Sequence, residues 1–113
     1  MKNNKDFEYN ETIDNLTIYH SKAKDEPVMG SIVVGNLIFD IGASGSFVSL
    51  EIDNASDVFN IVPRDFSKIK FANIKSIVQN NAILLIYAIS INNKEYERSL
   101  MIPKNKIQLP SIC

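Results

Sequence analysis

The chain alternates between short apolar segments and polar connections, and this pattern predicts β-strands along most of its length. Residues 37–39 form a continuous apolar run, which is typical of a buried strand. No segment keeps a helical period of apolar residues over several turns. The predicted strands cover residues 16–19, 28–34, 37–40, 47–52, 69–72, 82–91 and 96–102. The pattern therefore predicts an all-β protein, with a closed or half-closed barrel as its architecture.

The connections between these strands carry turn signals. Residues 53–57 are rich in turn-forming types, and Asn92 and Asn93 predict a two-residue turn because asparagine tolerates positive φ. Residues 1–15 are polar, and we expect them to form a flexible N-terminal segment. The remainder, residues 16–113, is expected to fold as one domain, since a chain of 113 residues suits a single core.

Composition narrows the class of protein. The hydrophobic fraction of 45% and the charged fraction of 22% are those of an ordinary globular chain. A net charge of −1 gives no electrostatic reason to expect nucleic acid or an acidic membrane surface as a partner. Cys113 is the only cysteine, so no internal disulfide can form. The N-terminus lacks a signal peptide, and the longest apolar run, residues 82–89, is too short to span a bilayer. We therefore expect a soluble, cytoplasmic protein.

The most informative position is Asp40, which ends an apolar run and is followed by small residues. The pattern places this carboxylate at the edge of a hydrophobic core, where a charge is costly. Gly42 and Gly45 allow a tight turn and the close approach of another backbone or a substrate. An acid in such a place indicates a functional site. The other interpretation is an aspartate that caps its own turn through its side chain.

The segment from Asp40 to Ser49 resembles the active-site loop of retropepsin-like aspartic proteases, the retroviral and retrotransposon type. That loop carries Asp-Thr/Ser-Gly-Ala, then a small residue and a strand with aromatic or aliphatic side chains. The preceding residues, 33–39, resemble the strand that leads into it. The resemblance implies that Asp40 is catalytic and that the active-site loop consists of Ile41, Gly42, Ala43 and Ser44.

The second half of the chain resembles the rest of that family's layout. Phe71-Ala72-Asn73 is similar to the opening of the hairpin flap that covers the substrate, although Ile74 stands where the family usually has glycine. The resemblance implies that Ala72, Asn73 and Ile74 contact substrate. It also implies a small acid-protease-type closed barrel with a flap hairpin, which forms one half of a two-fold dimer.

The implied activity is that of an aspartic endopeptidase, a hydrolase that processes a retroelement polyprotein. Hydrolysis of this kind needs two carboxylates that share one proton, one acting on water and the other on the scissile carbonyl. A chain with one such loop obtains the second aspartate from a second copy, so the resemblance implies a homodimer with Asp40 at the axis. The substrate would be an extended peptide bound as a strand. No metal or cofactor is expected.

Three departures from the family pattern favour an alternative. Ile41 replaces the usual threonine or serine, the predicted flap at residues 73–81 contains no glycine, and Leu109-Pro110 stands where the closing segment is expected. The domain is therefore expected to be truncated at its C-terminus. The alternative is a catalytically decayed module that dimerises or binds extended peptides without cleavage. A third hypothesis is an unrelated small β-barrel in which Asp40 only caps a turn.

Other candidate sites are weaker. His20 has no cysteine or histidine near it in sequence, so it is interpreted as an exposed or hydrogen-bonded side chain. Ser44, Ser46 and Ser49 would need a histidine partner to act as nucleophiles, and His20 is the only one in the chain. The sequence contains no phosphate-binding loop of the GxxxxGK type.

Overall fold

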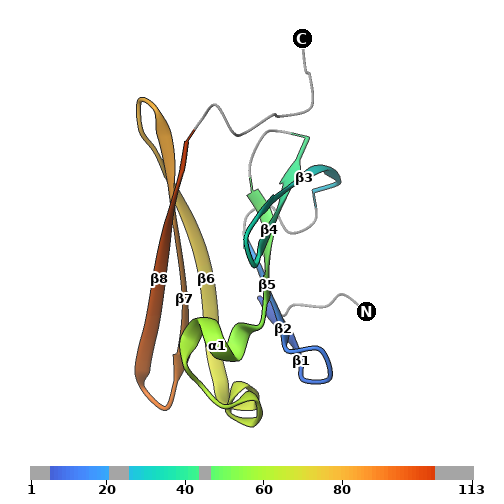
Figure 1. The fold of residues 1–113 in the computed structure, drawn as a ribbon, viewed down its shortest axis with the longest axis vertical. Coiled ribbons are helices and arrows are strands. Elements are labelled where there is room, and N and C mark those ends of the chain that lie inside the picture. The colour runs from blue at the N-terminus through green and yellow to red at the C-terminus, as the bar shows by residue number, and fades with distance from the viewer. Residues whose placement is uncertain (1–5, 21–25, 44–46, 104–113) are drawn as a thin grey trace.

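The computed structural model describes residues 6–20, 26–43 and 47–103. Within them the chain forms two antiparallel sheets, a short α-helix and a short 3-10 helix (Figure 1). The first sheet has five strands in the order β1-β2-β5-β4-β3, and the second has three in the order β6-β7-β8. The strands of the first sheet are β1 (Phe7–Asn10), β2 (Asn15–Tyr19), β3 (Val28–Val34), β4 (Leu37–Gly42) and β5 (Phe47–Asp53). Those of the second are β6 (Ile69–Val78), β7 (Ala82–Ile91) and β8 (Lys94–Pro103).

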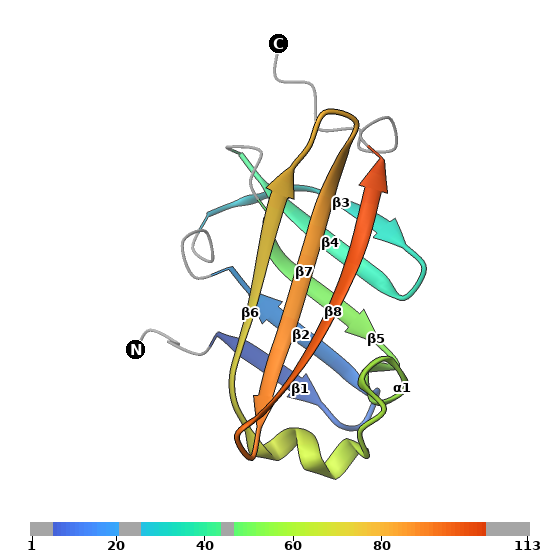
Figure 2. The same cartoon turned by 90° about the vertical axis from the view of Figure 1, so that its left-hand side faces the viewer.

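The two sheets pack face to face, and the helices α1 (Ala55–Phe59) and η1 (Pro63–Lys68) close one end between them (Figures 1 and 2). The all-β prediction is confirmed. The sheets are not closed into a barrel, because each keeps two edge strands: β1 and β3 in one, β6 and β8 in the other. Every pairing between neighbouring strands is antiparallel.

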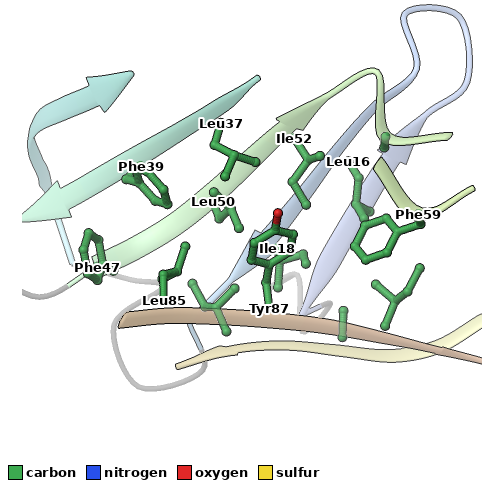
Figure 3. Packing of buried hydrophobic residues seen from close by; sticks show 14 of the residues in the cluster. Leu16, Ile18, Leu37, Phe39, Phe47, Leu50, Ile52, Phe59, Leu85 and Tyr87 are labelled. Atoms are coloured by element: carbon green, nitrogen blue, oxygen red, sulfur yellow. The ribbon is translucent and has the colours of Figure 1, made fainter. Parts of the chain in front are cut away.

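Alternation along the strands places the core between the sheets. Leu37, Phe39 and Ile41 of β4 point to the same face and are buried, whereas Ile38 and Asp40 point to the other. In β7 the inward positions are Leu85, Tyr87, Ile89 and Ile91. Figure 3 shows the side chains of both sheets meeting in this layer. Burial of this shared apolar layer is the main force that holds the two sheets together.

Sequence reasoning located most strands correctly. Strands β3 and β7 have the predicted bounds, and Asn92 and Asn93, with φ of 52° and 64°, form the predicted two-residue turn. Residues 7–10, inside the segment expected to be flexible, instead form edge strand β1. Phe7 and Tyr9 on that strand pack against the core, which explains why a polar segment is ordered there.

Helix α1 was not predicted because its five residues are too few to show a helical period. It is fixed by tertiary contacts instead. Asp14, in the turn between β1 and β2, accepts hydrogen bonds from the backbone N–H of Ser56 at 3.1 Å and from its hydroxyl at 2.7 Å. Arg98 of β8 donates to the Val58 carbonyl at 3.0 Å. Residues distant in sequence therefore supply the capping that the helix lacks locally.

The predicted flap is not separate from the second sheet. Strand β6 runs from Ile69 to Val78, and it pairs with β7 continuously from Phe71 to Val78 after a register shift between Ile69 and Phe71. Ala72 and Ile74 are buried in the core, and Asn73 lies exposed on the opposite face of the sheet. Of these three residues, only Asn73 therefore presents its side chain to solvent, and their contact with a substrate stays a prediction.

None of the helices in the described part of the chain has the length and apolarity needed to cross a membrane.

Candidate functional site

Asp40 lies on the outer face of the five-stranded sheet, on the side away from the core. Its carboxylate accepts a hydrogen bond from the Ser31 hydroxyl at 2.7 Å and another from the Ser49 hydroxyl at 2.8 Å. Ser31 pairs with Asp40 across β3 and β4, and Ser49 pairs with it across β4 and β5. The register of three neighbouring strands thus brings one carboxylate and two hydroxyls together.

This geometry corrects the expectation that Asp40 sits at the edge of the core. Because side chains alternate along β4, the burial of Phe39 and Ile41 places Asp40 on the opposite face, where it is half-buried. Nor do its bonds to Ser31 and Ser49 fit an aspartate that caps only its own turn, since both partners lie on other strands. Ser49 itself is 4% exposed, so its hydroxyl is largely removed from water and committed to the carboxylate.

The polar row continues across the sheet to Tyr19, which pairs with Ser49. The Tyr19 hydroxyl donates to the Glu8 carboxylate at 2.7 Å. Burial, the bond to Glu8 and the nearby carboxylates of Glu51 and Asp40 together raise the pKa of Tyr19 to about 12. The carboxylates of Glu8, Asp40 and Glu51 therefore share this face. They favour ligands that donate hydrogen bonds, and they repel anions close to Glu8 and Glu51.

The side chain of Glu26 lies close to the backbone at Gly42, two residues after Asp40. A Cβ at this glycine would overlap the side chain of Glu26, whose flexible end would have to move to make room. Residues 40 and 42 lie two apart on one strand, which places them on the same face about 7 Å apart. Glu26 is thereby a neighbour of the Asp40 site that the sequence pattern did not reveal. Ser31 was also missed, although its position opposite Asp40 follows once the β3–β4 register is known.

The structure does not gather the other predicted site residues around Asp40. Ile41 is 2% exposed and belongs to the core, Ala43 is exposed beyond the end of β4, and Ser44 lies outside the described residues. Ala72 and Ile74 face the core from the other sheet. The core layer therefore separates them from Asp40, which faces outward.

A hollow of the described surface lies at the edge of the first sheet. It has a volume of about 400 Å³, opens beside β1 and η1 and is lined by the carboxylates of Glu8 and Glu11 and by aromatic side chains. Two of its aromatic side chains, Tyr9 and Phe66, stack on each other with ring centroids 4.3 Å apart. Within residues 6–20, 26–43 and 47–103, no three histidine, cysteine or acidic side chains are grouped so that they could hold a metal ion.

Comparison with known proteins gives one informative relative. A Methanosarcina mazei protein named "Putative hypoxanthine phosphoribosyltransferase" is 30% identical over 107 residues, which span 92% of this chain and 85% of the relative. No protein-family model matches the sequence. No solved structure matches it either.

This relative overturns the resemblance to retropepsin-like proteases. Its name describes a transferase that acts on phosphoribosyl groups, not a peptidase, and 30% of the residues are identical over nearly the whole chain, whereas the retropepsin resemblance had one specific motif, the Asp40 loop. The predictions of an aspartic endopeptidase, of a retrotransposon hydrolase and of a non-catalytic peptide-binding module are therefore wrong. The broader prediction of an enzyme agrees with the relative, whereas the finer prediction of a hydrolase does not.

Proposed function

The chain belongs to the same family as this Methanosarcina mazei protein, and from that membership we propose that it is a transferase acting on a phosphoribosyl substrate. The observation that carries the proposal is 30% identity over 92% of the chain. A likeness of that extent includes the strands that form the Asp40 site, not only a motif.

The Asp40 site suits the sugar part of such a substrate. A carboxylate that accepts hydrogen bonds from hydroxyl groups is the arrangement by which proteins bind ribose hydroxyls. In this chain the hydroxyls of Ser31 and Ser49 occupy both carboxylate oxygens, one on each. Each oxygen has a second lone pair, and Asp40 is half-buried and so reachable from solvent. The ribose hydroxyls would donate to these remaining acceptor sites.

The reaction itself is a substitution at C1 of the ribose. The bond between C1 and a diphosphate oxygen breaks and the diphosphate leaves with the bonding electrons. A bond between C1 and a ring nitrogen of the purine base forms, and the proton of that nitrogen passes to solvent. Asp40 would orient the sugar through its hydroxyls without changing protonation. Positioning of this kind lowers the barrier because the reacting atoms no longer have to find their alignment in solution.

The remaining substrate groups are not assigned to residues. Nucleotide phosphates often bind at a helix N-terminus or in the crevice of a parallel sheet. The described strands pair antiparallel throughout, and α1 has five residues. The carboxylates of Glu8 and Glu51 would keep the phosphates away from their side of the sheet.

Titration of the full chain with 5-phosphoribosyl 1-diphosphate and Mg²⁺, followed by NMR, tests this assignment. We expect the amide signals of Ser31, Asp40 and Ser49 to shift more than those of the second sheet. Asp40→Asn should weaken binding about 10- to 100-fold, since a hydrogen bond to a charged group contributes about 1.5–3 kcal/mol. Asp57→Asn, an exposed acid on α1, is the matched control and should bind as wild type does. Shifts confined to other surfaces, or equal binding by both variants, would contradict the assignment.

A further inference from the structure

The outer faces of the two sheets differ in chemistry. The outer face of the five-stranded sheet carries the polar row of Ser31, Asp40, Ser49 and Tyr19. The outer face of the three-stranded sheet carries an apolar stripe along its middle strand, formed by Leu84, Ile86 and Ala88. These three residues alternate with the inward-facing core residues of β7; Leu84 and Ile86 are partly exposed, whereas Ala88 is only 4% exposed. No described element covers this face (Figure 2).

The stripe widens where strands β6, β7 and β8 run beside one another near the β6–β7 turn. Ile77 pairs with Leu84, and Leu84 pairs with Met101, so three apolar side chains form one row across the sheet. Ile77 is 46% exposed and Met101 is 49% exposed. A contiguous apolar patch of this kind is typical of an interaction surface, whereas single exposed apolar residues are not.

The two edges of the same face carry opposite charges. Lys75 lies on β6, in the row of Ile86, and Glu97 lies on β8, in the row of Ala88. Glu95 follows Glu97 along the same edge. One edge is therefore basic and the other acidic, with the apolar stripe between them.

We propose that this face binds a second copy of the chain, so that two three-stranded sheets pack back to back around a two-fold axis along β7. Such an axis places β6 of one copy over β8 of the other. Ile77 then meets the partner's Met101, and the stripes of the two copies lie on each other. The partner's Glu97 then lies about 7 Å further along the strand direction than Lys75, because their rows are two residues apart. A lysine side chain can span that distance.

The symmetry makes the surface complementary to itself. In a two-fold interface, if residue i of one copy contacts residue j of the other, then j of the first also contacts i of the second. Lys75 of each copy therefore lies near Glu97 of the other, which gives two attractive charge pairs. Three strands of ten residues present a face of about 14 Å by 34 Å, from the usual strand spacing and rise. Two such faces bury roughly 1,000 Å² in total, the lower limit for a specific interface. The site on the other sheet stays open to solvent in this arrangement.

Sedimentation velocity of the full chain over a range of concentrations tests the proposal. We expect a reversible dimer, at least tenfold weaker in Ile86→Lys and in Met101→Lys. Val33→Lys is the matched control, because Val33 is equally apolar and 67% exposed on the other sheet, and it should leave the dimer unchanged. Thermal unfolding at low concentration, compared with wild type, shows whether each variant is folded.

Exchanging the charges of Lys75 and Glu97 tests whether these two residues meet across the interface. Lys75→Glu alone and Glu97→Lys alone should each weaken the dimer by placing like charges together, and the double variant should recover most of the wild-type affinity. A monomer at every concentration would overturn the proposal. So would a dimer that Ile86→Lys and Met101→Lys leave intact, or a double variant no stronger than the single ones.

Discussion

Phe39→Ala is expected to lower the free energy of unfolding by about 3–5 kcal/mol, the cost of emptying a fully buried phenylalanine site. Phe39 is 0% exposed, and its ring contacts that of Phe47, with centroids 5.6 Å apart. The cavity would open beneath β4, the strand that carries Asp40 on its other face. A domain of this size has a total stability of about 5–15 kcal/mol, so the loss is a large fraction of it.

Urea unfolding followed by far-UV circular dichroism measures this effect. Val33→Ala is the control: Val33 lies on the neighbouring strand but faces solvent, so its truncation should cost less than about 0.5 kcal/mol. A loss below 1 kcal/mol in Phe39→Ala would contradict the description of one shared core between the sheets.

The second large effect is expected at Asp14, which joins the β1–β2 turn to helix α1. Its carboxylate accepts hydrogen bonds from the Tyr9 hydroxyl at 2.7 Å and from Ser56. Asp14 also has a φ of 52°, which a residue with a short polar side chain adopts more easily than alanine does. Asp14→Ala should therefore lower the free energy of unfolding by about 2–4 kcal/mol, the combined cost of lost hydrogen bonds and left-handed backbone.

The same residue gives the stability a pH dependence. Burial acts to raise the pKa of Asp14, but the hydrogen bonds from Tyr9 and Ser56 outweigh it and leave the pKa below its usual value. A lowered pKa in the folded state means that the stabilisation is present above about pH 4, the unfolded value, and is lost as the pH falls through the folded value. Wild type should therefore lose its advantage over Asp14→Asn as the pH falls below about 4.

Asp14→Asn isolates the charge, since asparagine tolerates positive φ equally well. Asp57→Asn, on the exposed side of α1, serves as the control and should keep the wild-type pH profile. A constant difference in stability between wild type and Asp14→Asn from pH 7 to pH 2 would show that the carboxylate is not linked to folding in this way.

Most strands were predictable because they are long enough for alternation or a continuous apolar run to appear in sequence. The four-residue strand β1 and the second half of β6 were missed. The Asn92–Asn93 turn was predictable because the left-handed backbone restricts the residue types that fit. Helix α1 was not, since the residues that hold it, Asp14 and Arg98, lie some 40 positions away along the chain. Long-range contacts of this kind leave no local signal.

The candidate site was likewise predictable only in part from the sequence. Asp40 stood out as an acid at the end of an apolar strand, but the apolar run 37–39 suggested the edge of the core, whereas alternation within β4 turns the carboxylate outward. Ser31 and Ser49 become its partners only through the register of three strands. The segment from Asp40 to Ser49 pointed to a protease because a short motif can resemble that of an unrelated family, and similarity over 92% of the chain corrected it.

The most direct test of the proposed function is transfer of the phosphoribosyl group itself. The purified chain is incubated with 5-phosphoribosyl 1-diphosphate, Mg²⁺ and labelled hypoxanthine, and the nucleotide product is separated and counted. We predict product formation that depends on protein concentration and is reduced at least tenfold in Asp40→Asn but not in Asp57→Asn. Absence of nucleotide product from folded wild-type protein, with hypoxanthine and with the other purine bases, would contradict the proposal.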